Sequence, residues 1–357
     1  MNRRILLVRL REIGDVVFTT PAIRALRRHW PDAHLTYIVE TAAAPVVRHN
    51  PHVDRLIVAP RHRGIRGLLA DLTLARRLRA ERYDLAIDFH GGPRASLLTW
   101  LSGARRRVGY AVAGRTWMYT TRVSRPRELR ARHSVENQWD LLRAIDIPAP
   151  DRAADSVEMP IDPVAAATVA ERLDRIGVAA DDRIIVIHVS AGNPFRRWPL
   201  DRFVTLAREL VDRDPRRRVV VTSGPSERYA VQYVINRAGA LPAGEFSLPE
   251  LRALVDRAAL YIGGDSGPLH IAATSSTPIV GLYGPTLPER SAPWRDPRFA
   301  TISVDAGSLE CRPCDQRVCA PGDFRCLTMI SVEQVLDAAE RLLASGSQSS
   351  AATSNQR

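Results

Sequence analysis

The stretch Tyr261–Thr286, YIGGDSGPLHIAATSSTPIVGLYGPT, decides the fold of this chain. It predicts a strand, a glycine-rich turn at 263–267, a helix that begins at Pro268, and a second strand. Glycine lets the backbone approach a ligand closely, and a helix start presents free N–H groups and a positive dipole end. The stretch therefore predicts an α/β domain with an anion site, for which phosphate is the natural ligand. A plain connection with glycines chosen only for their backbone angles is an open alternative.

Three polar side chains in this stretch favour binding over a plain connection. Asp265 and Ser266 fall in the expected turn, and His270 falls in the helix that follows. A plain connection needs no polar group at these places. His270 has a second interpretation, as a helix histidine whose hydrogen bonds are made within the protein.

Short strands and helices alternate along almost the whole chain. The expected strands are 5–8, 34–39, 56–58, 85–88, 184–188, 219–222 and 260–262, and the expected helices are 21–29, 68–82, 134–145, 164–176, 200–212, 227–238, 248–257 and 332–343. This alternation predicts parallel sheets covered by helices. Residues 109–132 show no clear period and are expected to form a long ordered loop.

A cluster of prolines divides the chain into two such runs. It comprises Pro148, Pro150, Pro160 and Pro163, with polar residues between them. The sequence therefore predicts one Rossmann-like domain at 1–155, a second at 156–344, and a polar, disordered tail at 345–357. Two parallel-sheet domains in tandem are expected to face each other across a cleft, with the carboxyl ends of their strands toward it.

The composition is that of a soluble protein. The 357 residues are 45% hydrophobic and 25% charged, and no apolar run reaches the roughly 18 residues of a membrane span. Arg9 and Arg11 come too early for the apolar core of a signal peptide. A cytoplasmic location is therefore expected.

The net charge of +12 raises the question of an anionic partner. All 51 basic residues are arginine, and they are scattered along expected helices without the interleaved aromatics that stack on bases. Nucleic acid is therefore not expected as a partner. Arginine forks suit phosphate well, so an anionic membrane surface or a phosphorylated acceptor remains reasonable.

A single carboxylate follows the first expected strand. In Leu10–Pro21, LREIGDVVFTTP, Asp15 is placed on the loop after the strand and hence at its carboxyl edge. Asp15 can alternatively be a helix cap, which is the commoner role. No G-x-G-x-x-G follows the strand, which argues against a nicotinamide or flavin enzyme.

Several separated motifs, in one order, resemble the heptosyltransferase family of bacterial glycosyltransferases. They are RLREIGDVVFTTPAIRALRRHWPDAHLTYIV, VSAGNPFRRWPLDRFVTLARELV, TSGPSE and GGDSGPLHIAATSSTPIVGLYGPT. The resemblance implies a GT-B architecture of two Rossmann-like domains, with the acceptor bound by the N-terminal half and the nucleotide sugar by the C-terminal half. It implies transfer of heptose from ADP-heptose to lipopolysaccharide core at the cytoplasmic face of the inner membrane, without a divalent ion.

The resemblance also assigns roles to residues. Asp15 matches the general base of an inverting transfer, which takes the acceptor proton as the hydroxyl attacks the anomeric carbon. Arg196 and the N–H groups of Ser266 and Gly267 are expected to stabilise the departing ADP. Glu227 matches an acid that hydrogen-bonds the donor ribose. Asp265 and His270 match positions around the donor phosphates and sugar.

Two of these positions carry alternatives. The family usually has lysine where this chain has Arg196 in PFRRWP, so a planar fork replaces an ammonium group. Arg196 and Arg197 can instead be surface residues before a helix, with Trp198 and Pro199 as its hydrophobic staple. Glu227 can be a first-turn glutamate that favours the helix dipole.

Acceptor contacts are expected from the N-terminal half. Arg61, Arg63 and Arg66 lie in RHRGIRG, a loop suited to phosphate or carboxylate groups. His90 follows the strand that ends at Asp88, again at the expected cleft edge. Asp212 and Asp214 spell a DxD, which is interpreted as a solvated helix end.

All four cysteines fall in one short segment, CRPCDQRVCAPGDFRC. Cys311, Cys314, Cys319 and Cys326 have a spacing that permits a structural zinc site with four thiolates. Reduced thiols or one redox disulfide are equally open interpretations. A catalytic zinc is not expected, because four thiolates leave no open position.

Other functions on the same fold remain as alternatives. They are transfer of a different nucleotide sugar, hydrolytic epimerisation of a sugar nucleotide, and non-catalytic binding of a nucleotide sugar. The Asp15 loop argues against epimerisation, because it serves an acceptor.

Overall fold

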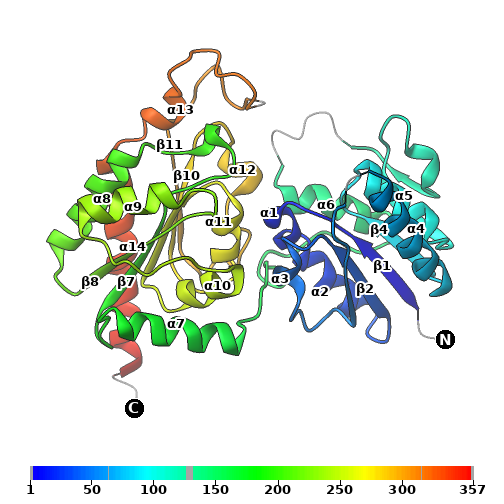
Figure 1. Ribbon diagram of the computed structural model, residues 1–357, viewed down its shortest axis with the longest axis horizontal. Helices are drawn as coiled ribbons and strands as arrows, with labels where there is room; N and C mark the ends of the chain where they lie inside the picture. Colours follow the sequence, from blue (N-terminus) through cyan, green and yellow to red (C-terminus); the bar gives the residue numbers. More distant parts are fainter. Residues whose placement is uncertain (1–2, 63, 126–131, 315, 355–357) are drawn as a thin grey trace. The chain divides into compact units, whose positions relative to one another are not determined.

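The computed structural model describes residues 3–62, 64–125, 132–314 and 316–354, with side chains described as far as residue 345. The chain forms two compact units, Met1–Pro160 and Ile161–Arg357. Each unit contains one parallel β-sheet with helices packed on it, as the alternation of strands and helices predicted (Figure 1).

The N-terminal unit is built on a six-stranded sheet with the order β3-β2-β1-β4-β5-β6. Its strands are β1 (Arg4–Val8), β2 (His34–Val39), β3 (Arg55–Val58), β4 (Leu85–Asp88), β5 (Arg106–Tyr110) and β6 (Thr121–Val123). All neighbouring strands are parallel, and Val8 of β1 is in register with Asp88 of β4. The chain segments that follow β1 and β4 therefore leave the sheet at the same edge.

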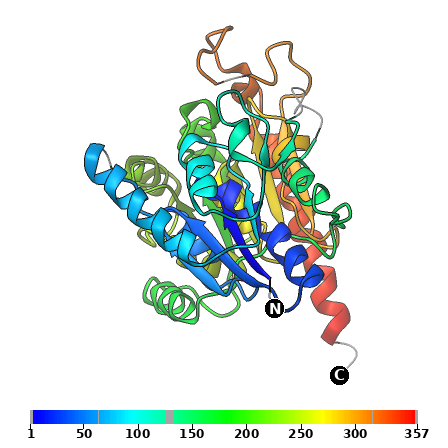
Figure 2. The same cartoon turned by 90° about the vertical axis from the view of Figure 1, so that its right-hand side faces the viewer.

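Helices cover both faces of this sheet (Figure 2). They are α1 (Ile13–Val17), α2 (Thr20–His29), α3 (Ala44–Val47), α4 (Gly64–Ala80), α5 (Pro93–Leu101), the 3₁₀ turn η1 (Thr116–Met118) and α6 (Ser134–Arg143). On one face, Leu78 of α4 and Leu98 of α5 pack on Leu6 and Val8 in a buried cluster. Because successive side chains of a strand point to opposite faces, the sheet can bury apolar residues on both sides.

The segment expected to be a long loop contains two strands. Residues 109–132 include the end of β5, η1 and β6. Strands β5 and β6 were not predicted because arginines interrupt their runs of apolar residues. In the structure the residues at the inner end of β5 are buried, and the arginines at its start are not. The ring of Tyr119 lies against Gly109, where an added Cβ would lie 2.3 Å from a ring carbon. Gly109 therefore has no side chain because the buried Tyr119 ring occupies that space.

The C-terminal unit is built on a five-stranded sheet with the order β11-β10-β9-β7-β8. Its strands are β7 (Arg183–His188), β8 (Arg217–Thr222), β9 (Leu260–Gly264), β10 (Ile279–Tyr283) and β11 (Thr301–Asp305). Its helical elements are α7 (Pro163–Arg175), η3 (Pro194–Arg196), α8 (Leu200–Arg213), α9 (Arg228–Ala238), α10 (Leu248–Asp256), α11 (Gly267–Ala272), α12 (Pro288–Ser291), α13 (Arg325–Thr328) and α14 (Val332–Ser354). The tandem order of Rossmann-like sheets is the arrangement that the family resemblance implied.

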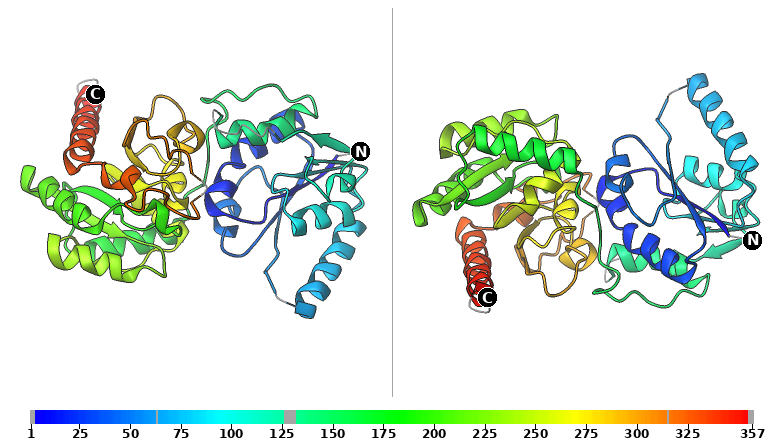
Figure 3. Two further views of the ribbon diagram at one scale, coloured as in Figure 1. Left: turned by 90° about the horizontal axis from the view of Figure 1, so that it is seen from above. Right: turned by 90° about the horizontal axis from the view of Figure 1, so that it is seen from below.

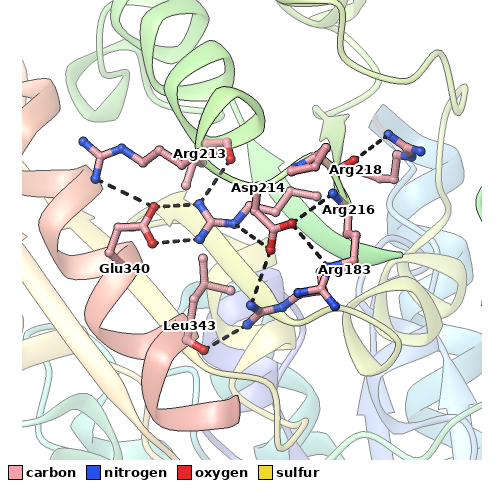
Figure 4. Close-up of polar contacts among 10 residues, drawn as sticks. Arg183, Arg213, Asp214, Arg216, Arg218, Glu340 and Leu343 are labelled. Carbon is pink, nitrogen blue, oxygen red and sulfur yellow. Dashed lines mark hydrogen bonds and ion pairs between the residues drawn. The ribbon is translucent and has the colours of Figure 1, made fainter. Parts of the chain in front are cut away.

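An arginine network ties α14 to the sheet (Figure 4). Arg217 of β8 is 6% exposed and forms two hydrogen bonds with Glu340, at 2.6 and 2.7 Å. Asp214 caps the carboxyl end of α8 and accepts the backbone N–H of Arg216. The second aspartate of the DxD spelling therefore belongs to a helix end within this network. Helix α14 continues to Ser354, past the expected end at Leu343.

Candidate active site

Asp15 lies in a short helix rather than in the expected loop. The N-cap of α1 is Glu12, so Asp15 is in the first turn and is not the cap. Its carboxylate accepts a hydrogen bond from the guanidinium of Arg9, which leaves the end of β1. The Asp15 side chain is 36% exposed, whereas that of Arg9 is 12% exposed. The structure thus presents an oriented and accessible carboxylate at the carboxyl end of a strand.

Arg9 also connects Asp15 to the neighbouring strand. Its Nη1 donates to the carbonyl oxygen of Phe89 at 2.6 Å, directly after β4. Asp88, fully buried, accepts N–H groups of His90 and Gly91 at 2.9 Å and the hydroxyl of Tyr119 at 2.6 Å. Burial raises the pKa of Asp88, although these hydrogen bonds oppose the shift. Asp88 therefore fixes the turn that carries His90.

His90 lies near the same charges. Burial and the positive charges of Arg9 and Arg11 lower its pKa to about 4, although the nearby charge of Asp15 opposes the shift. The ring is therefore neutral near pH 7, and a neutral imidazole can donate one hydrogen bond and accept another. The structure brings His90 and Asp15, both predicted from the sequence, to one edge of the N-terminal sheet.

The predicted arginine loop lies after β3. Arg61 and Arg66 are exposed, and Arg66 is in the first turns of α4. Arg63 lies outside the described residues. Arg94, which was not predicted, donates to both oxygens of Asp71 and to Glu40 at 2.7 to 3.1 Å. It holds the start of α5 against α4 and so fixes the base of this loop.

Asp265 is the centre of a charged cluster in the C-terminal unit. It follows β9 and is 2% exposed. Its carboxylate lies 3.2 Å from Nη1 of Arg196 and 3.5 Å from Nε2 of His270, and it accepts the hydroxyl of Thr286 at 2.5 Å. Burial alone raises the pKa of Asp265, but the hydrogen bond from His270 and the charge of Arg196 outweigh it and lower the pKa to about 2. Asp265 is thus a fixed anion near neutral pH.

Arg196 extends from this cluster toward solvent. Its Nη1 also donates to the Asp265 carbonyl at 3.0 Å, and its Nε donates to Oε1 of Gln316 at 2.7 Å. The side chain is 29% exposed, so part of the guanidinium is available to a ligand. Arg196 is therefore not a plain surface arginine, because its Nε and Nη1 are bound within the protein, although Trp198 does form the expected staple of the next helix by packing on Phe203.

The glycine-rich turn divides into two parts with different roles. Gly263 and Gly264 belong to β9, and a Cβ on Gly264 would lie 3.1 Å from the Arg196 carbonyl oxygen. The missing side chains of Gly263 and Gly264 therefore make room for neighbouring protein atoms and not for a ligand. Ser266 is the N-cap of α11, and its hydroxyl oxygen is buried without a hydrogen-bond partner among the described residues. Gly267 begins α11, which has only six residues. Any stabilisation of a bound anion there comes from local N–H groups more than from the dipole of a long helix.

Glu227 is bound by the second arginine of PFRRWP. It is the N-cap residue of α9, one position before the first turn, and its side chain makes no capping hydrogen bond. Its carboxylate lies 2.7 Å from Nη2 of Arg197. Nearby, Ser190 accepts the N–H of Gly224 at 2.7 Å and lies 3.2 Å from Nε2 of the buried His188. The ends of β7 and β8 thus hold Glu227 in a defined turn.

Trp198 and Pro199 continue this segment into the core. The Trp198 ring is 3% exposed, packs edge-on against Phe203 and donates to the carbonyl of Ile330 at 3.0 Å. Pro199 is the N-cap of α8. This anchor fixes the backbone that presents Arg196 and Arg197 to two different acids.

The described residues do not support the structural zinc site that the cysteine spacing permitted. The four cysteines are free, and the described residues hold no group of three or more histidine, cysteine or acidic side chains placed to bind a metal. Burial, with the nearby Cys311 and Cys314, raises the pKa of Cys326 to about 11, so this thiol is protonated at neutral pH. The sequence spacing permitted zinc, reduced thiols or a disulfide, because spacing does not fix how the four side chains converge.

Sequence reasoning missed the partners that orient the site. Arg9, Arg197, Thr286 and Gln316 each bind a predicted residue, but none was given this role from the sequence, although Arg9 and Thr286 share a motif with their partners. Arg197 was visible only as a neighbour of Arg196, and Gln316 is far from it in sequence. Charged residues directly after strands were the one usable signal, because parallel strands end at a common edge.

Two Rossmann-like units, each with charged side chains where its strands end, are the construction of a GT-B glycosyltransferase. Comparison with known proteins agrees. The model of glycosyltransferase family 9 (heptosyltransferase) matches residues 72–323. The chain belongs to glycosyltransferase family 9.

Individual relatives match over nearly the full length. Lipopolysaccharide heptosyltransferase 3 of Escherichia coli (strain K12) is 29% identical over 345 residues, which are 94% of this chain and 96% of that protein. The crystal structure of a glycosyl transferase family 9 protein from Veillonella parvula DSM 2008 has a TM-score of 0.85 and 26% identity, covering 97% of this chain and 98% of the other. The E. coli ADP-heptose heptosyltransferase II structure, at 19% identity and a TM-score of 0.76, covers 96% of this chain and 99% of its own and shares the fold.

Proposed function

We propose that this glycosyltransferase transfers heptose from ADP-heptose to a sugar of the lipopolysaccharide core, with inversion at the anomeric carbon and without a metal ion. The observation that carries the proposal is the pairing of Arg196 with the buried carboxylate of Asp265, which holds a partly exposed cation at the ends of β9 and β7. The similarity to a lipopolysaccharide heptosyltransferase over almost the whole chain supports this choice of sugar and acceptor.

Asp15 acts on the acceptor in the proposed reaction. Its accessible carboxylate takes the proton of an acceptor hydroxyl as the hydroxyl oxygen forms a bond to the anomeric carbon. The bond from that carbon to the diphosphate breaks on the opposite face, and ADP leaves with the electron pair. Arg9 keeps the carboxylate oriented throughout. His90 and the arginines Arg61, Arg63 and Arg66 are proposed to bind the anionic acceptor.

The C-terminal unit binds the donor in the proposed reaction. The guanidinium of Arg196 and the N–H groups of Ser266 and Gly267 compensate the charge that develops on the departing diphosphate. Glu227 accepts hydrogen bonds from the donor ribose, and His270 and Asp265 lie beside the phosphates and sugar. Because a fixed arginine supplies positive charge, no divalent ion is required for this step.

A location at the cytoplasmic face of the inner membrane, with the chain bound peripherally to the anionic surface, follows from the proposed acceptor. Among the described residues, no helix combines the length and apolar content needed to cross a bilayer. The net charge of +12 favours attraction to acidic headgroups.

The proposal is tested by presenting the enzyme with a panel of nucleotide sugars and a core acceptor, and by analysing the product by mass and anomeric configuration. ADP-heptose should give a heptosylated acceptor of inverted configuration, at an unchanged rate after treatment with a chelator. Efficient transfer from another nucleotide sugar, with none from ADP-heptose, would move the assignment to a different donor. Donor binding without transfer to any acceptor would favour a non-catalytic binding protein.

A further inference from the structure

Helix α4 carries an apolar stripe on its solvent side. Ile65, Leu68, Leu69 and Leu72 are 75%, 57%, 58% and 39% exposed. Their spacing of three and four residues places them on one face of the helix. Leu78 of the same helix faces the opposite way and packs in the core. The helix is therefore anchored to its unit by one face and offers leucines to solvent with the other.

The position of α4 leaves this stripe open within the N-terminal unit. Figures 2 and 3 draw α4 as the light-blue helix at the margin of that unit, with α5 beside it. Arg94 of α5 binds Asp71 of α4 at 2.7 Å and so fixes the inner side of the helix. An exposed stripe of large aliphatic side chains on an otherwise amphipathic helix marks an interaction surface.

Positive charge surrounds the stripe. Arg66, Arg76 and Arg77 are exposed residues of α4 and make no hydrogen bond or ion pair with other described residues. The one acid of the helix, Asp71, is neutralised by Arg94. Leucines flanked by unpaired arginines are the composition of helices that lie in the headgroup region of an anionic bilayer.

Two exposed tryptophans lie on neighbouring elements. Trp100 of α5 is 38% exposed and Trp117 of η1 is 56% exposed, and their rings contact edge to face at 5.2 Å. Tryptophan prefers the membrane interface, because its ring is apolar and its N–H is polar. Helix α5 packs against both α4 and η1, so one tryptophan belongs to a helix that contacts α4 and the other to the turn beside it.

We propose that α4 is the membrane-docking element of this protein, with Ile65, Leu68, Leu69 and Leu72 inserted between the headgroups of an anionic bilayer and Arg76 and Arg77 bound to the phosphates. This deepens the proposed function, because it names the surface that brings the enzyme to a lipid-borne acceptor. A second copy of the chain fits the stripe less well. Pairing two such helices brings unpaired arginines together, and four side chains cover far less than a stable interface needs.

Vesicle flotation with the full-length chain tests the docking surface without donor or acceptor. The protein should float with vesicles of phosphatidylcholine mixed with phosphatidylglycerol, and should float poorly with phosphatidylcholine alone or at high salt. The double variant Leu68→Ser/Leu69→Ser should lower partitioning at least about tenfold. Arg76→Glu/Arg77→Glu should lower it at least about twentyfold.

Matched controls come from the C-terminal unit. Val164, 75% exposed on α7, provides Val164→Ser, and the exposed Arg175 and Arg257 provide a double charge reversal to glutamate with the same net charge. These controls should retain most of the binding. An equal loss of vesicle binding in the control and test variants would mean that net charge alone causes the binding, and would overturn the proposal. Leucine variants that bind vesicles like the parent would overturn it as well. A dimer in sedimentation that Leu68→Ser/Leu69→Ser dissociates would assign the stripe to a second copy.

The result is separable from the proposed function. Vesicle binding that depends on α4 can be found even if ADP-heptose proves to be the wrong donor. Conversely, transfer from ADP-heptose to a soluble core oligosaccharide, with no α4-dependent flotation, would retain the proposed function and reject the docking surface.

Discussion

Nη1 of Arg196 lies 3.2 Å from Oδ2 of Asp265, a carboxylate that is almost completely buried. The arginine comes from the turn after β7 and the aspartate from the end of β9, two strands that are hydrogen-bonded neighbours. A buried acid thus fixes one side of the guanidinium while its other side remains open. Adjacent in sequence, Arg197 reaches a different acid, Glu227.

Replacing Arg196 should impair the departure of the nucleotide. Arg196→Ala removes the cation that we propose compensates the leaving diphosphate, and leaves the buried Asp265 with only His270 and the Thr286 hydroxyl beside its carboxylate. We expect kcat to fall by about 10²–10³, the typical effect of losing one stabilising donor. Arg196→Lys should recover part of the rate, because it keeps the charge but not the fork. Steady-state kinetics with ADP release as the readout measure this, with Arg175→Ala as the control. A normal kcat in Arg196→Ala would remove Arg196 from the reaction.

Arg9 is expected to act through Asp15 as a positioning residue. Arg9→Met removes the hydrogen bond to the Asp15 carboxylate and the one to the Phe89 carbonyl. We expect kcat to fall by about tenfold or more, while the affinity for ADP, measured by calorimetry, stays unchanged, because the proposed donor site lies in the other unit. Arg9→Lys should restore part of kcat. Weaker ADP binding in Arg9→Met, in step with the loss of rate, would indicate general damage to the fold.

Acid should destabilise the protein through His188. This fully buried histidine has its pKa lowered from 6.5 to about 4 by burial, and it lies 2.9 Å from the hydroxyl of Thr222. Between these two values the unfolded chain binds a proton that the folded chain does not, so stability falls as the pH drops from about 6.5 to about 4. The full contribution is on the order of 3 kcal/mol.

Urea denaturation at several pH values measures this dependence. The slope of unfolding free energy against pH between 4 and 6.5 should be smaller in His188→Gln than in the parent chain. Exposed His62 supplies the control His62→Gln, whose slope should match the parent. Parallel slopes for all three proteins would show that His188 does not carry the effect.

Gly109 should not tolerate a side chain. A methyl group there meets the Tyr119 ring, which is buried and cannot move freely because its hydroxyl is bound to Asp88 and Ser96. Gly109→Ala should lower the free energy of unfolding by about 1–3 kcal/mol, the usual cost of overpacking. Gly192→Ala is the matched control, since nothing lies within 4 Å of a Cβ at that position. Equal stabilities of the two variants would show that the Tyr119 ring can shift.

The sequence predicted the two parallel sheets well, because β-branched runs alternate with amphipathic helices along the chain. It failed for β5 and β6, whose exposed positions carry arginine and whose register depends on Tyr119 packing over Gly109. Packing between residues far apart in the chain does not produce a periodic pattern of apolar residues in the sequence. The helical stretch of α14 beyond Leu343 was also missed, because its serines lower helix propensity.

In the candidate site, too, some features could be predicted from the sequence and others could not. Asp15, His90, Asp265 and Arg196 could be predicted as candidates because each lies directly after a strand or in a motif near one. Their partners were not found, because contacts such as the hydrogen bond of Arg196 with Gln316 and its ion pair with Asp265 join residues far apart in sequence. The cysteine spacing could not decide between zinc and free thiols, since close spacing in sequence does not by itself bring side chains to tetrahedral geometry.

The most direct test of the central claim is transfer from ADP-heptose to a core acceptor by the parent enzyme and by Asp15→Asn, with product detected by mass. The amide keeps the size of the side chain but cannot accept the acceptor proton. We predict heptosylated product from the parent and a rate lower by about 10²–10⁴ in Asp15→Asn, with ADP binding unchanged. A full rate of transfer by Asp15→Asn would contradict the mechanism.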